Sequence, residues 1–130
     1  MAKIFIIERD KFFSSSLEAK LSYGGFEVKM PYDLNNNWFL IQEVKTYNPN
    51  FIVLEPDLPL SYGQEILSGI KKEDNISSIP VVLFSEMAED YANKLLNQGA
   101  SYYFSKKSLN IDDFVDTISR IAKNKYKLNI

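Results

Sequence analysis

Short apolar runs alternate five times with amphipathic segments along this chain. The runs have the length of buried strands, whereas the segments repeat apolar residues at spacings of three and four, which is typical of helices. The expected strands cover residues 4–7, 26–30, 51–54, 80–84 and 101–104. The expected helices lie between Asp10 and Gly24, over 38–47, around 66–70, over 87–98 and after Asn110.

This alternation predicts an α/β fold. The connections between strands are too short for anything except crossover helices, so the strands are expected to be parallel. Right-handed crossovers, with helices needed on both faces, favour a doubly wound five-stranded parallel sheet of order 2-1-3-4-5. The weaker, alternating run at 26–30 suits an edge position.

Capping residues and apolar stripes support the helices. Asp10 and Asn110 are suitable N-caps, and Gly24-Gly25 and Gly99 are suitable stops. In the first helix we expect one buried stripe, formed by Phe12, Phe13, Leu17 and Leu21. The final helix has the clearest pattern, formed by Ile111, Phe114, Val115, Ile118 and Ile121.

Composition narrows the possible functions. The 130 residues, 45% of them hydrophobic, suit a single domain. The chain has no Cys and no His, which excludes disulfides, thiol nucleophiles and histidine bases. A net charge of -2 without long single-sign runs gives no support for nucleic acid or a membrane surface as a partner. The N-terminal apolar run turns charged at Glu8, too early for a signal peptide, so a cytoplasmic protein is expected.

Polar residues follow four of the expected strands. Glu8 and Arg9 follow the first, Glu55 the third, Ser85 the fourth and Lys106 the fifth. In an open α/β sheet, sites form in the crevice beyond the carboxyl ends of the strands. We therefore expect these five side chains to share one rim.

In length, order of elements and spacing of these residues, the chain resembles the receiver domain of two-component response regulators. The resemblance places the family's acidic pair at Glu8 and Arg9 and its phosphorylated Asp at Glu55. Its further positions fall on Leu58, Pro59 and Gly63 after the acceptor, the hydroxyl residue Ser85, the switch aromatic Tyr103 and the lysine Lys106. It also implies a partner surface on the fourth helix, fifth strand and fifth helix, where Tyr102 or Tyr103 is either an interface anchor or strand packing.

Three positions depart from the family pattern. Arg9 replaces the second acid, Glu55 replaces the acceptor Asp, and Lys107 stands where a Pro usually follows the lysine. Two carboxylates and two cations would make the pocket neutral without Mg²⁺. At roughly 4 Å, each opposite pair attracts by about 1 kcal/mol in water and about 4 kcal/mol at an effective dielectric near 20. We therefore hypothesise that Arg9 replaces the metal and, with Lys106, holds Glu55.

The sequence thus predicts a degenerate, non-enzymatic receiver domain over residues 1–123, with a tail or linker stub at 124–130. It would act as a phosphorylation-independent protein-interaction module without a cofactor, and it is a possible homodimer. Glu55 would either mimic the phosphorylated state or plug the site. One alternative is a genuine phospho-accepting regulator that uses Glu55 and Mg²⁺, with Glu8, Asp10, Glu55 and Asp57 as weak candidate ligands. Another is a small flavin or nucleotide carrier on the same sheet.

Overall fold

A parallel sheet forms the centre of the computed structural model, which describes residues 1–56 and 62–130. Its five strands run in the order β2-β1-β3-β4-β5, and every neighbouring pair is parallel. The strands are β1 (Lys3–Ile7), β2 (Glu27–Lys29), β3 (Phe51–Leu54), β4 (Val81–Ser85) and β5 (Tyr102–Ser105). The predicted fold class and strand order are confirmed.

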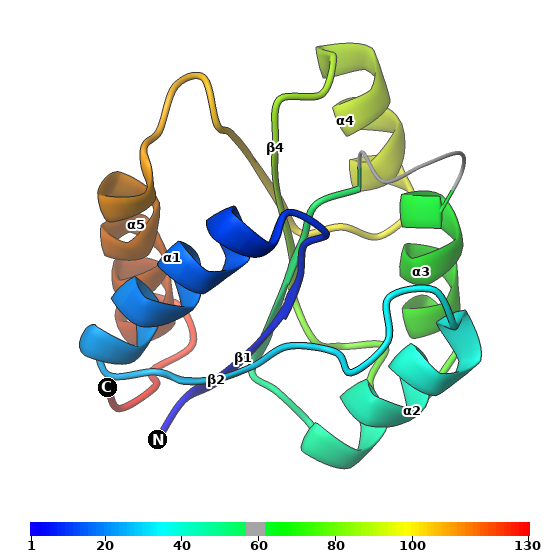
Figure 1. Ribbon diagram of the computed structural model, residues 1–130, viewed down its shortest axis with the longest axis horizontal. Coiled ribbons are helices and arrows are strands. Elements are labelled where there is room, and N and C mark those ends of the chain that lie inside the picture. The colour runs from blue at the N-terminus through cyan, green and yellow to red at the C-terminus, as the bar shows by residue number, and fades with distance from the viewer. Residues whose placement is uncertain (57–61) are drawn as a thin grey trace.

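Helices cover both faces of this sheet (Figure 1). One face carries α1 (Lys11–Tyr23) and α5 (Ile111–Asn124). The other carries α2 (Asn37–Tyr47), α3 (Tyr62–Lys71) and α4 (Glu89–Asn97). Within residues 1–56 and 62–130, no helix is long and apolar enough to cross a membrane.

The buried strands supply two separate hydrophobic cores. In β1, Ile4 and Ile6 belong to the core under α1 and α5, whereas Phe5 and Ile7 belong to the core under α2, α3 and α4. Successive side chains of a strand point to opposite faces, so a continuous apolar run serves both cores. Each fully buried side chain of this size stabilises the fold by about 1.5–3 kcal/mol.

Local capping fixes where the helices begin and end. The side chains of Asp10, Asn36 and Asn110 each accept a hydrogen bond from the backbone N–H three residues later, at 3.0, 2.9 and 2.8 Å. These bonds satisfy N–H groups that a helix start leaves without partners. Gly25 and Gly99 follow α1 and α4 with φ of 100° and 115°, a conformation that favours glycine.

Two details differ from the sequence-based expectation. Phe12 is 86% exposed and does not join the buried stripe of α1. Phe13, Leu17 and Leu21 are spaced by four and face the sheet, and Phe12 is rotated by about 100° from Phe13 around the helix axis. In addition, α4 begins at Glu89, because Ala88 has an extended backbone (φ −64°, ψ 147°) and is the N-cap, and Met87 is buried before the helix starts.

The residues after α5 fold back onto the molecule. The Tyr126 ring stands edge-on to Phe51, with 5.2 Å between ring centroids, and the Leu128 N–H donates to the Ala122 carbonyl at 2.9 Å. Tyr126, Leu128 and Ile130 pack against the core under α1 and α5. These last residues therefore cover the end of the sheet opposite the strand ends that carry Glu8 and Glu55.

Candidate functional site

The carboxyl ends of four strands bring the predicted polar residues together. Glu8 follows β1, Glu55 follows β3, Ser85 ends β4 and Lys106 follows β5. They line a cleft of about 450 Å³. Parallel strands all end at the same edge of the sheet, which is why residues far apart in sequence meet there.

Lys106 lies between the two glutamates. Its Nζ is 2.7 Å from Glu8 Oε1 and 3.0 Å from Glu55 Oε2, and its side chain is only 18% exposed. The ammonium also lies 3.9 Å from the centroid of the Phe13 ring, a favourable cation–π position. Burial alone would lower the pKa of Lys106, but the hydrogen bonds and charges of Glu8 and Glu55 outweigh it and raise this pKa.

The oxygens that do not face Lys106 have other donors. Ser85 Oγ donates to Glu55 Oε1 at 2.6 Å. The backbone N–H of Asp10 donates to Glu8 Oε2 at 3.0 Å. Each of the four carboxylate oxygens therefore has a donor from the protein, and bonds to charged groups are roughly twice as strong as neutral ones.

Arg9 does not take part, which corrects the expectation that it would hold Glu55. Its side chain is exposed, and its Nη2 donates to Asn35 Oδ1 at 3.1 Å. Glu8 turns into the cleft, so the next residue leaves β1 on the other side, toward the connection between β2 and α2. Two carboxylates and one ammonium remain at the centre of the cleft. Within residues 1–56 and 62–130, the expected balance of two carboxylates by two cations is therefore not found.

Tyr103, at the position of the family's switch aromatic, ties β5 to the connection before α4. Its hydroxyl donates to the carbonyl of Met87 at 3.2 Å and lies 3.4 Å from that of Ser85. Tyr102 stacks on Phe104, and its hydroxyl lies 3.4 Å from that of Tyr126. Tyr102 and Tyr103 are both partly buried, so neither is a freely exposed anchor.

The described side chains do not fit a Mg²⁺ ion. In residues 1–56 and 62–130, no three acidic side chains are arranged to hold a metal. Mg²⁺ requires near-octahedral oxygen ligands at about 2.0–2.1 Å, whereas the oxygens of Glu8 and Glu55 are engaged by N–H and O–H donors. Asp10 is exposed and its Oδ1 caps α1. Asp57, Leu58 and Pro59 lie outside the described residues.

Two cleft residues were not anticipated from the sequence. Phe13 and Glu86 line the cleft together with Asp10. The apolar stripe of α1 predicts that Phe13 is buried, but it gives no sign that the ring lies under the Lys106 ammonium. Glu86 directly follows Ser85, so its place after the end of β4 was the feature of the sequence that could have predicted a position in the cleft.

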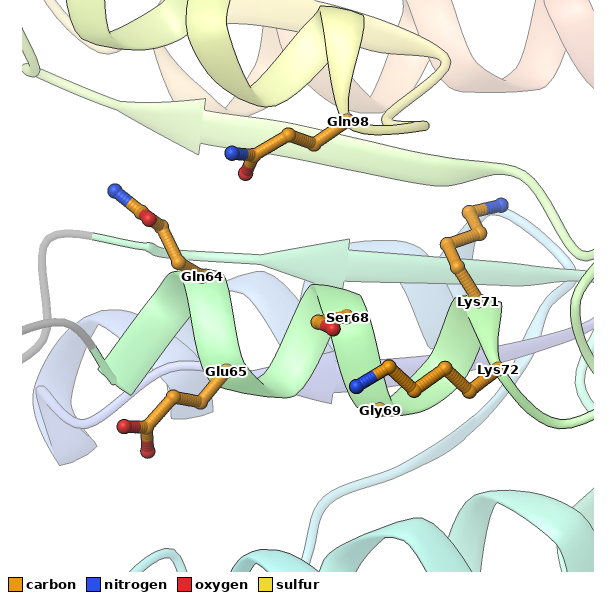
Figure 2. Close-up of a pocket in the computed structure, with 7 residues that line it drawn as sticks. All are labelled: Gln64, Glu65, Ser68, Gly69, Lys71, Lys72 and Gln98. Carbon is orange, nitrogen blue, oxygen red and sulfur yellow. The ribbon is translucent and has the colours of Figure 1, made fainter.

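A larger groove of about 690 Å³ lies between α3 and the end of α4 (Figure 2). Its side chains do not converge, since Gln64 and Glu65 point in opposite directions from α3. The Lys71 ammonium is engaged by the carbonyls of Ser77 and Ile79 at 2.9 and 3.3 Å. In contrast, the polar groups of Glu8, Glu55 and Lys106 face one another in the smaller cleft. We therefore take that cleft as the candidate site.

Comparison with known proteins agrees with this fold. The family model of the response regulator receiver domain matches residues 4–119, and the chain therefore belongs to the response regulator receiver domain family. This match confirms the receiver assignment. It does not test the degenerate character of the site.

Individual relatives share about a quarter to a third of their residues with this chain over the matched region. A probable transcriptional regulator, ycf29, from Pyropia yezoensis is 30% identical over 80% of this chain and 46% of its own length. The polar-differentiation response regulator DivK from Brucella anthropi is 24% identical over 57% of this chain and 60% of its own length. The chain thus spans about half the length of the curated relatives it matches. A two-component response regulator structure from Clostridium difficile has a TM-score of 0.79 and 25% identity, covering 96% of this chain and 98% of that one.

Proposed function

We propose that this receiver domain is a protein-interaction module whose signalling state does not depend on phosphorylation. The observation that carries the proposal is the position of Lys106, which bridges Glu8 and Glu55 inside the cleft. A phosphoryl group arriving at Glu55 would have to displace both this ammonium and the Ser85 hydroxyl. The domain would carry out no turnover of its own and use no cofactor.

The extra methylene of Glu55 supports a second part of the proposal. Glutamate is one methylene longer than the aspartate that receives the phosphoryl group in the family. The Glu55 carboxylate thereby reaches Ser85 Oγ and Lys106 Nζ, at 2.6 and 3.0 Å, as a phosphoryl group on aspartate would. It carries one negative charge where a phosphate carries about 1.5 to 2. We therefore propose that Glu55 acts as a fixed, partial mimic of the phosphorylated state.

The proposed output surface consists of α4, β5 and α5. Ser85 contacts Glu55 through its side chain, and the Tyr103 hydroxyl donates to the carbonyl of Met87, two residues beyond Ser85. The state of the cleft is thereby linked to the segment that enters α4. A partner protein, or a second copy of this chain, that binds α4, β5 and α5 would meet one preset conformation.

The decisive experiment is incubation with acetyl phosphate, with and without Mg²⁺, followed by intact-mass measurement. The expected result is an unchanged mass in both conditions. A Mg²⁺-dependent gain of one phosphate that is absent from Glu55→Ala would overturn the proposal and establish a phospho-accepting regulator. A gain that persists in Glu55→Ala would place the acceptor elsewhere and would also contradict it.

A second experiment separates a mimic from a plug. A partner captured by the wild-type domain should bind Glu55→Ala more weakly, because alanine cannot engage Ser85 or Lys106. The same partner should bind Glu18→Ala as tightly as wild type, because Glu18 is a carboxylate of α1 outside the cleft. Equal affinity for all three proteins would show that Glu55 only fills the site.

A further inference from the structure

A line of packed aromatic rings, which we call the aromatic series, runs from the cleft through the core under α1 and α5. Its members are Phe13, Phe84, Phe114, Phe104, Tyr102 and Tyr126. The ammonium of Lys106 lies 3.9 Å from the centroid of the Phe13 ring and 5.9 Å from that of the Phe84 ring. The Phe13 and Phe84 rings pack with 5.7 Å between centroids. Phe84 in turn stacks on Phe114, with 3.9 Å between centroids and 4° between ring planes, which links the cleft to α5.

The aromatic series continues along β5 to the residues that follow α5. The rings of Phe114 and Phe104 meet edge to face at 5.9 Å, and Phe104 stacks on Tyr102 at 6.2 Å between centroids. The Tyr102 hydroxyl lies 3.4 Å from the Tyr126 hydroxyl, and the Tyr126 ring stands edge-on to Phe51 at 5.2 Å. Aromatic pairs at about these separations attract one another. Direct contacts therefore connect the cleft at one end of the sheet with Tyr126 at the other.

Tyr126 lies in a segment that we call the strap, residues 125–130. The Leu128 N–H donates to the Ala122 carbonyl of α5 at 2.9 Å, and Lys127 has a φ of 56°. This left-handed conformation is costly for a residue other than glycine. Each strap residue is exposed or only partly buried. A chain end with few bonds and little buried surface opens more readily than the strands of a sheet, so the strap is the element expected to have two states.

We propose that the aromatic series couples the position of Lys106 to the strap. In the structure, the ammonium covers the Phe13 ring and the strap is docked. Protein interiors are packed with few voids, and a ring that shifts therefore displaces its neighbours. Withdrawing Lys106 removes the cation from the face of Phe13 and lets this ring move against Phe84. The strap then opens more often, which makes it the two-state element that such a coupling requires.

This coupling gives the cleft a second connection to the rest of the domain, separate from the link through Tyr103. The Tyr103 hydroxyl reaches the Met87 carbonyl before α4, whereas the aromatic series ends at Tyr126, just after α5. Opening of the strap uncovers the Phe51 ring, which is fully buried when the strap is docked. The coupling depends on where Lys106 lies and not on what displaces it, so it does not rest on the proposal that phosphorylation is dispensable.

Amide hydrogen exchange of the full chain, measured by NMR, tests the coupling. The Leu128 N–H reports on the strap, and the Asn50 N–H, which donates to the Lys3 carbonyl at 2.8 Å, reports on the sheet at the same end. In Lys106→Met, exchange at Leu128 should accelerate by at least about fivefold relative to Asn50, because the strap opens separately from the sheet. Equal acceleration at both amides would reflect lower global stability alone and would overturn the proposal, as would unchanged exchange at Leu128.

A variant of the first ring tests the series without changing a charge. Phe13→Leu keeps every charged group of the cleft, but it removes the ring on which the Lys106 ammonium lies. Exchange at Leu128 should still accelerate by at least about threefold relative to Asn50. This variant gives the answer even where Lys106→Met folds poorly, and a strap that stays as protected as in wild type would contradict the proposal.

A break in the middle of the aromatic series should abolish the effect. Phe104→Leu removes the ring between α5 and Tyr102, so adding Lys106→Met should change the ratio of the two exchange rates less than about twofold. The matched control is Phe39→Leu, which changes a ring that pairs with Tyr32 outside the series. In that background, Lys106→Met should have its full effect. A full effect in Phe104→Leu, or a lost effect in Phe39→Leu, would show that the rings of the series do not carry the coupling.

Discussion

Lys106 Nζ lies 3.0 Å from Glu55 Oε2, although β4 separates the two strands that these residues follow. The ammonium also reaches Glu8, at 2.7 Å, so a single cation spans from β1 to β5 across the end of the sheet. The structure thereby assigns to Lys106 the role that the sequence suggested for Arg9 and Lys106 together. The predictions below follow from this arrangement and from the packing around it.

Removing the Lys106 ammonium should destabilise the fold. In Lys106→Met, the carboxylates of Glu8 and Glu55 would face each other in the cleft without a cation, and loss of one partner of a buried ion pair costs about 3 kcal/mol. Urea unfolding measures the change. Adding Glu55→Gln to Lys106→Met should recover part of the lost stability. The control is Lys20→Met, which breaks the exposed ion pair with Asp112 and should cost less than about 1 kcal/mol. A Lys106→Met protein as stable as wild type would show that the bridge contributes nothing.

The response to Mg²⁺ should depend on Lys106. Adding Mg²⁺ to about 10 mM should leave the melting temperature of the wild-type protein unchanged. A ligand stabilises a protein by mass action only if it binds the folded state, and no binding is expected here. In Lys106→Met, the ammonium no longer competes for Glu8 and Glu55, so Mg²⁺ should raise the melting temperature of this variant. Thermal scans with Mg²⁺ and with matched ionic strength from NaCl separate binding from screening. A clear increase for the wild type would mean that the cleft accepts the metal.

The contribution of Lys106 should persist to alkaline pH. Because its pKa is raised in the folded state, the stabilisation is fully present below the unfolded pKa of about 10.4 and is lost as pH rises through the folded value. The difference in unfolding free energy between wild type and Lys106→Met should therefore stay constant from about pH 7 to pH 10 and shrink above that. Chemical unfolding across this range tests it, and a difference that fell already near neutrality would contradict the assignment.

Two glycines of α3 should respond differently to the same substitution. A Cβ on Gly63 would lie 2.4 Å from the Pro56 carbonyl oxygen, so Gly63→Ala must shift backbone and should cost about 3 kcal/mol or more. A Cβ on Gly69 would meet only the end of the Ile41 side chain, at 3.3 Å. Alanine also gains about 1 kcal/mol of helix propensity over glycine, so Gly69→Ala should remain within about 1 kcal/mol of wild type. Equal losses in the two variants would show that the contact with Pro56 does not matter.

The Tyr103 hydroxyl should stabilise the segment before α4. Tyr103→Phe keeps the ring but removes the hydrogen bond to the Met87 carbonyl, which should cost about 1 kcal/mol. Hydrogen exchange should show faster opening at the start of α4. Tyr23→Phe, which removes a hydroxyl from a fully solvated ring, should change neither measurement. Unchanged exchange in Tyr103→Phe would mean that the bond is not formed in solution.

Most of the fold could be predicted from periodicity. Continuous apolar runs indicated strands buried on both faces, and the two cores that share β1 and β3 show why those runs are continuous. The misplaced Phe12 shows the limit of this reasoning. Phe12 and Phe13 are neighbours, and the sequence does not fix the residue at which the helix starts, so either ring could continue the apolar stripe. The Asp10 cap sets the helix start, and packing against the sheet then partly buries Phe13 and leaves Phe12 exposed.

The residues of the site were found from their places at strand ends, but their contacts were not. Backbone topology fixes where a parallel strand ends, so the sequence alone determined that Glu8, Glu55, Ser85 and Lys106 share one edge of the sheet. Whether the side chain after Glu8 turns into the cleft or away from it depends on the path of the backbone as it leaves β1, and on Asn35, which accepts the Arg9 hydrogen bond. That choice of partner is a long-range effect, and only the tertiary structure decided that one lysine, without the arginine, holds both glutamates.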